Sequence, residues 1–73
     1  MYDISYLDET VVGSCKKNFS RIYPEFKPIV LGVCSDKTSI IIQCDFPDGT
    51  FYFKVTDTMV SHAYKSKEDA DRA

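Results

Sequence analysis

The sequence predicts a small α+β protein in which a three-stranded antiparallel meander carries two helices, in the order α-β-β-β-α. Two observations support this prediction. At 38–56, two β-branched and aromatic runs flank Pro47-Asp48-Gly49, where proline pre-sets a turn and glycine accepts a positive φ. Ahead of this hairpin, apolar residues recur with helical spacing. We expect both helices to pack on one face of the sheet.

The first helix is expected over residues 7–22. At about 100° per residue its apolar side chains fall within an arc of about 140°, which is typical of a helix with one buried stripe. The stripe consists of Leu7, Val11, Val12, Cys15, Phe19 and Ile22. Ser5 or Asp8 can cap the helix, and it should end at Tyr23-Pro24 because a residue before proline is pushed out of the helical region.

Three strands are expected to follow. Residues 28–34 are apolar at every position, too few for a buried helix and rich in β-branched residues, which favours a strand covered on both faces. The expected strands are Ile29–Cys34, Ser39–Phe46 and Phe51–Thr56, with a turn at Ser35–Lys37. The alternation of Tyr2, Ile4 and Tyr6 would fit a further short strand ahead of the first helix.

The register of the hairpin decides which side chains face the core, because a slip of one residue exchanges the two faces. A type I turn with Gly49 in a bulge would place Phe46 opposite Thr50, whereas a four-residue loop over 47–50 would place Phe46 opposite Phe51. The longer loop matches apolar with apolar residues, so we favour it. The inward side chains are then Ile42, Cys44, Phe46, Phe51, Phe53 and Val55.

A second helix is expected after Thr56, capped by Asp57 or Thr58. Its apolar side would consist of Met59, Val60, Ala63 and Tyr64. The polar residues 66–73 are expected to form a frayed tail of a single domain that spans residues 1–73.

Size and charge argue against several classes of function. A chain of 73 residues buries a small core, which leaves little room for an enzyme's interior cavity. A net charge of −2 makes nucleic acid a less favourable partner, because binding nucleic acid depends on neutralising phosphates. No apolar run approaches the length of a membrane span, and acids stand where a signal peptide needs positive charge. We expect a cytoplasmic, non-enzymatic protein without membrane contact, acting as a monomer or weak dimer.

The cysteines and the histidine do not form a pattern typical of a metal or catalytic site. Cys15, Cys34 and Cys44 are odd in number and lack CxxC spacing, so we expect reduced, buried thiols instead of disulfides or zinc ligands. His62 falls outside the apolar side of the expected second helix, which favours a surface position over pairing with a nucleophile. We therefore expect no cofactor, no metal and no catalytic residue.

The α-β-β-β-α order is similar to that of double-stranded RNA-binding domains, and YKSKEDADRA resembles the start of their second helix. The resemblance implies an RNA-binding module, and Lys16, Lys17 and Arg21 on the polar side of the first helix are the candidate contacts. The sequence departs from the family at two places. The family has a basic pair where this chain has Lys67-Glu68, and it has a Gly-Pro-x-His loop where this chain has Ser35–Lys37. Nucleic-acid binding is therefore the alternative function.

The outward face of the hairpin is the favoured candidate site. Its residues are Ile41, Gln43, Asp45, Tyr52 and Lys54. An exposed tyrosine beside an isoleucine with a polar rim is typical of a protein-binding patch, although the two can also simply pack together on an uncovered sheet. We expect Tyr52, Ile41 and Lys54 to be anchors and Asp45 to match a basic partner segment.

The edge strand Phe51–Thr56 would in addition offer its backbone groups to a strand of a partner. The sequence thus predicts a small regulator or inhibitor of a larger protein. Compact, mildly acidic domains without site chemistry are typical of phage-encoded inhibitors of host machinery, and transcription is the first candidate process.

Overall fold

The computed structural model describes residues 2–3 and 9–73. Its elements are β1 (Tyr2–Asp3), α1 (Glu9–Ile22), β2 (Ile29–Cys34), β3 (Ile40–Phe46), β4 (Gly49–Val55) and α2 (Lys67–Asp71). The strands form one antiparallel sheet in the order β1-β2-β3-β4. This confirms the α+β class and the meander of β2, β3 and β4. The short strand expected near Tyr2 is present as β1, and the rest of that alternation lies outside the described residues.

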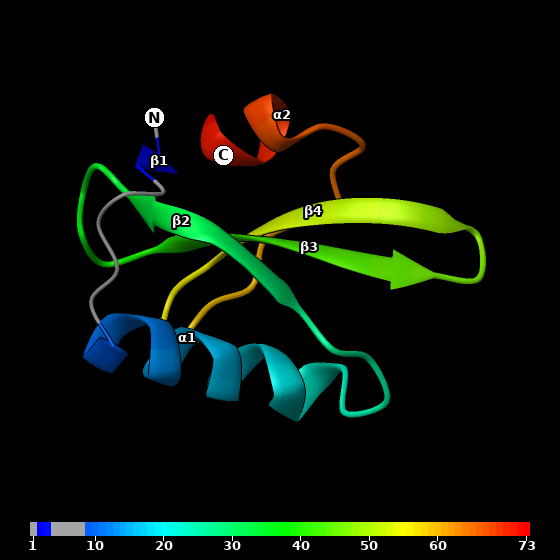
Figure 1. Cartoon of the computed structure of the whole chain (residues 1–73), viewed down its shortest axis with the longest axis horizontal. Coiled ribbons are helices and arrows are strands. Elements are labelled where there is room, and N and C mark those ends of the chain that lie inside the picture. Colours follow the sequence, from blue (N-terminus) through cyan, green and yellow to red (C-terminus); the bar gives the residue numbers. More distant parts are fainter. Residues whose placement is uncertain (1, 4–8) are drawn as a thin grey trace.

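The two helices cover opposite faces of the sheet, so the expectation that they share one face is wrong (Figure 1). The face under α1 holds the larger core cluster: Cys15, Phe19, Val33, Ile40, Ile42, Cys44, Phe53 and Val55. On the other face, Ala70 of α2 packs in one cluster with Ile41 and Cys34. The apolar side chains of β2 and β3 alternate between both faces, and each face gains free energy when it is removed from water.

Helix α1 ends at Ile22, before Tyr23-Pro24, as expected. Its buried stripe includes Cys15 and Phe19, but the Ile22 side chain is 53% exposed, contrary to the expectation. Tyr23 stacks on Phe19 with ring centroids 4.9 Å apart and so covers the core beside the last turn of the helix. The expected Leu7, Ser5 and Asp8 positions lie outside the described residues.

The buried stripe of α1 includes a polar residue that was not expected from the sequence. Asn18 is 3% exposed, and its Nδ2 donates a hydrogen bond to the carbonyl of Thr56 at 3.0 Å. The Arg21 guanidinium in turn donates to Asn18 Oδ1 at 2.6 Å. Asn18 therefore attaches α1 to the chain just after β4.

The β3–β4 turn consists of Pro47 and Asp48 alone, so neither of the two expected registers is correct. Phe46 pairs with Gly49, whose φ of +139° suits glycine. This register differs by two residues from the four-residue loop, and a shift of two keeps every side chain on its face. The side chains toward α1 are therefore the expected ones, namely Ile42, Cys44, Phe46, Phe51, Phe53 and Val55.

Strand β2 is covered on both faces, as expected. Val30 and Val33 pack in the cluster under α1, whereas Leu31 and Cys34 pack in the cluster under α2. The pairing with β3 shifts between Val30 and Gly32, which leaves Leu31 as an extra residue. Leu31 lies on the α2 face, where it borders the candidate site.

Residues 57–66 form no helix, which overturns the expectation of a second helix there. The segment returns along the outer edge of β4 instead. The backbones of Tyr64 and Tyr52 exchange two hydrogen bonds of 2.8 Å, and Ser61 N donates to the Lys54 carbonyl at 3.0 Å. An edge strand exposes N–H and C=O groups that need partners, and this segment supplies them. The β4 edge is therefore occupied by the chain itself.

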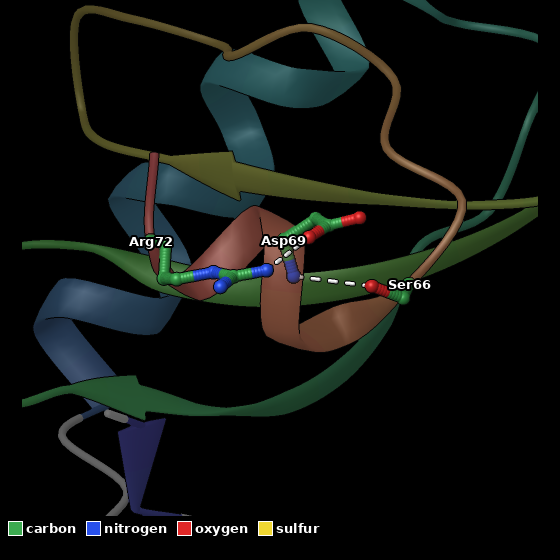
Figure 2. A network of polar contacts seen from close by, with 3 residues as sticks. All are labelled: Ser66, Asp69 and Arg72. Atoms are coloured by element: carbon green, nitrogen blue, oxygen red, sulfur yellow. Dashed lines mark hydrogen bonds and ion pairs between the residues drawn. The ribbon is translucent and has the colours of Figure 1, made fainter.

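The expectation of a frayed tail over 66–73 is also wrong, because α2 lies there. The Ser66 hydroxyl accepts a hydrogen bond from Asp69 N at 3.1 Å, and the Arg72 guanidinium pairs with the Asp69 carboxylate (Figure 2). A hydrogen bond from the Arg72 side chain and, as a smaller cause, one from the Ser66 side chain lower the pKa of the Asp69 carboxyl. Ala70 is fully buried on the strands below. Serine followed three residues later by an acid is a helix N-cap signature that the sequence carried.

Candidate functional site

The structure separates the residues expected on the outward face of the hairpin. Ile41 is fully buried under α2, so it is removed from the candidate surface. Lys54 is half-buried and its Nζ donates to the carbonyl of Ala73 at 3.1 Å. Asp45 is exposed and accepts a hydrogen bond from Thr50 Oγ1 at 2.6 Å. Only part of the expected patch therefore faces solvent.

Gln43 and Tyr52 form the centre of what remains. They lie directly opposite each other on β3 and β4, and both are half-buried. Together with Val30 and Leu31 of β2 and residues 65–68 at the start of α2, they line a hollow of about 410 Å³, which we name the α2 groove. The groove exists because α2 is short. Figure 1 shows α2 above one part of the sheet while the β3–β4 hairpin extends past both helices.

The wall of the α2 groove toward α2 is basic. Lys65 and Lys67 are exposed, and neither is in an ion pair with any residue that the structure describes. Glu68 lines the same groove, so the wall carries one net positive charge, from two lysines and one glutamate. Asp45 lies two positions from Gln43 along β3 and hence on the same face, nearer the hairpin tip. The surface is thus basic beside α2 and acidic toward the tip.

Lys65 and Lys67 were not among the expected site residues, because the sequence reasoning placed them in or beside a frayed tail. The signal that locates them is the N-cap pair Ser66 and Asp69, which fixes the start of α2. With α2 fixed over Ile41, the two lysines on either side of Ser66 come to border the sheet face.

A second hollow, of about 550 Å³, lies between the β2–β3 turn and the segment that covers the β4 edge. The Asp36 carboxylate in this hollow has structural partners. Asp36 accepts hydrogen bonds from the backbone N–H of Thr38 and from both the N–H and the hydroxyl of Ser39, which lowers the pKa of Asp36. His62 is exposed, and its ring packs edge-on to the ring of Tyr64 with the two ring centroids 6.5 Å apart. Asp36 therefore holds the turn, and no reactive pair forms around it within the described residues.

The three cysteines are buried, as expected, and none of them forms a disulfide within the described residues. Burial raises the pKa of Cys15 and of Cys34 to about 11, and it also raises the pKa of Cys44. All three are therefore neutral thiols near pH 7. Within the described part of the chain, no three His, Cys, Asp or Glu residues come together as a metal site requires.

Lys16, Lys17 and Arg21 are all exposed on α1. Arg21 also donates to Asn18, so its guanidinium is partly engaged within the helix. Because α1 and α2 cover opposite faces of the sheet, these residues and the lysines of the α2 groove do not form one continuous basic surface.

Comparisons with protein-family models, with curated proteins and with solved structures give no match to this chain. Among the described residues, no helix has both the length and the apolar character needed to cross a membrane. The function is therefore inferred from the residues of the α2 groove themselves.

Proposed function

We propose that this chain is a small non-enzymatic binding module that regulates or inhibits a larger protein by surface contact. The observation that carries the proposal is the α2 groove, where Tyr52 and Gln43 stay accessible on the face of the sheet that α2 covers only in part. A partly buried aromatic residue with apolar neighbours and a charged rim is typical of the centre of a protein interface. A partner would place a side chain over Tyr52 and contact Asp45 at the rim.

The non-enzymatic role is supported by the state of the nucleophilic groups. The thiols are buried and neutral, as their raised pKa values indicate. The Ser61 hydroxyl accepts a hydrogen bond from Lys54 N at 2.8 Å and donates to the His62 carbonyl at 3.0 Å. The hydroxyl of Ser61 is thus used by the backbone and is not activated by the His62 ring.

The test is affinity capture from a bacterial lysate, with RNA polymerase as the first candidate because a phage-type modulator of transcription is the specific case that we propose. Gln43→Arg places a long charged side chain in the α2 groove and should reduce the captured protein at least about tenfold, a loss of about 1.4 kcal/mol. Tyr52→Ala should act in the same direction. Ser20→Arg, an exposed change on α1, is the matched control and should capture as the wild type does.

Capture that neither Gln43→Arg nor Tyr52→Ala alters would contradict the proposal. Recovery of RNA in place of protein, with loss of that RNA when Lys16 and Lys17 are changed to glutamate, would instead support the nucleic-acid alternative. Both variants of the groove should first be shown to fold by circular dichroism, since Tyr52 also packs against the cluster under α2.

A further inference from the structure

We infer that the α2 groove takes an extended acidic segment of the partner protein, with an apolar side chain over Tyr52 and a carboxylate beside Lys65 and Lys67. This inference rests on the proposed function and adds the chemistry of the partner. It follows from the charge of the groove wall, from the apolar character of its strand side, and from the position of Asp45.

The α2 groove combines positive charge with apolar surface. Leu31 of β2 and Tyr52 of β4 supply the apolar part of the groove, since the Val30 side chain packs under α1, while Lys65 and Lys67 border it from the start of α2. An exposed lysine alone is an ordinary solvated group. A carboxylate that binds beside an apolar surface is partly shielded from water, which strengthens its attraction to both ammonium groups. A ligand that is apolar and acidic at neighbouring positions therefore matches the groove better than either kind alone.

The net positive charge of the groove wall is small. Glu68 lines the same groove, so the net excess is a single positive charge. The basic residues of α1, such as Lys16 and Lys17, lie across the sheet from the groove and cannot extend its positive surface. Binding of a nucleic acid gains strength from many neutralised phosphates along a continuous track. The groove fits one or two carboxylates instead.

The rim of the groove toward the hairpin tip is acidic. Asp45 is exposed two residues along β3 from Gln43, a distance of about 7 Å at the rise of a strand. A second acid on that side would be repelled, whereas a neutral or basic residue would not. The segment that fits therefore has its acidic residues on the α2 side of its apolar anchor. A volume of about 410 Å³ suits one large side chain and its neighbours, not a folded element.

The test uses three capped hexapeptides, acidic Ac-SDDLFS-NH2, basic Ac-SKKLFS-NH2 and neutral Ac-SSSLFS-NH2, titrated into the ¹⁵N-labelled protein. We expect the acidic peptide to shift the backbone amide signals of Gln43, Tyr52 and residues 65–68 and to bind at least about tenfold more tightly than the basic one. The double variant Lys65→Glu/Lys67→Glu should reverse this preference. The matched double variant Lys16→Glu/Lys17→Glu should keep it.

The inference is overturned if the acidic peptide causes no shift at about 2 mM, binds no better than the basic peptide, or shifts amides elsewhere. It is also overturned if a twelve-nucleotide thymidine oligomer shifts the same amides at lower concentration than the acidic peptide. If Lys65→Glu/Lys67→Glu leaves partner capture intact while Gln43→Arg abolishes it, the inference fails and the proposed function stands. If Gln43→Arg also leaves capture intact, both fail.

Discussion

Replacing Ile41 by alanine tests whether α2 covers the second face of the sheet. Ile41 is fully buried, although hairpin alternation alone places it on the solvent side. Removing a buried isoleucine side chain down to alanine costs about 2–5 kcal/mol, because it loses burial and leaves a cavity. A substitution at the surface changes the free energy of unfolding by no more than about 0.5 kcal/mol. A 73-residue domain has a total free energy of unfolding of about 4–11 kcal/mol, so Ile41→Ala should remove a large part of it if Ile41 is buried.

Urea unfolding, followed by circular dichroism and by tyrosine fluorescence, measures the effect in a chain with five tyrosines and no tryptophan. With a slope of about 1 kcal/mol per molar urea, the midpoint for Ile41→Ala should fall by about 2 M or more. Ile42→Ala, on the α1 face, should cost a similar amount. Ile29→Ala is the control, since that side chain is 51% exposed. A midpoint for Ile41→Ala equal to that of Ile29→Ala would refute the placement of α2.

Three further predictions concern polar and ionisable groups. Asn18→Ala leaves the Thr56 carbonyl without its side-chain donor and should cost about 1–3 kcal/mol in urea unfolding, and an unchanged midpoint would contradict the attachment of α1. Because the pKa of Asp36 is lowered, its carboxylate stabilises the native state in full above the ordinary pKa of 3.8. This contribution is lost as the pH falls through the lowered pKa. Asp36→Asn should therefore flatten the acid limb of the stability curve, and an equally steep limb would argue against the turn contacts. The pKa values of Cys15 and Cys34 are raised from 9.0 to about 11. The native state is therefore stabilised in full by their neutral thiols below pH 9, and this stabilisation is lost as the pH rises toward 11. Alkylation by iodoacetamide at pH 8 should then require unfolding, and fast labelling of native protein is the contrary result.

The parts of the fold that the sequence predicted depend on local periodicity. The helical spacing around Cys15 and Phe19 and the alternation in β3 are properties of neighbouring residues, so α1 and the two faces of the hairpin could be assigned. The hairpin register could not. Cys44 meets Phe51 in the structure, whereas the four-residue loop would pair Cys44 with Phe53, and both pairs are apolar. Matching of apolar pairs does not distinguish registers that differ by two residues.

The second helix was misplaced because the pattern of residues 59–64 fits two structures. Its apolar positions suit one side of a helix, but the backbone of β4 needs hydrogen-bond partners on its outer edge, and this tertiary requirement decides the outcome. The burial of Ile41 follows from the position of α2 and could not be seen from β3 alone. In the candidate site, Gln43, Tyr52 and Asp45 came from strand alternation, whereas Lys65 and Lys67 required the N-cap at Ser66 to be recognised.

In the proposed function, a partner protein binds the sheet face beside α2. The most direct test is the dissociation constant of the captured partner for three proteins: the wild type, Gln43→Arg and the control Ser20→Arg. We expect Gln43→Arg to weaken binding at least about tenfold, or about 1.4 kcal/mol, whereas Ser20→Arg should bind as the wild type does. Equal dissociation constants for all three proteins, each shown to be folded, would contradict the proposed function.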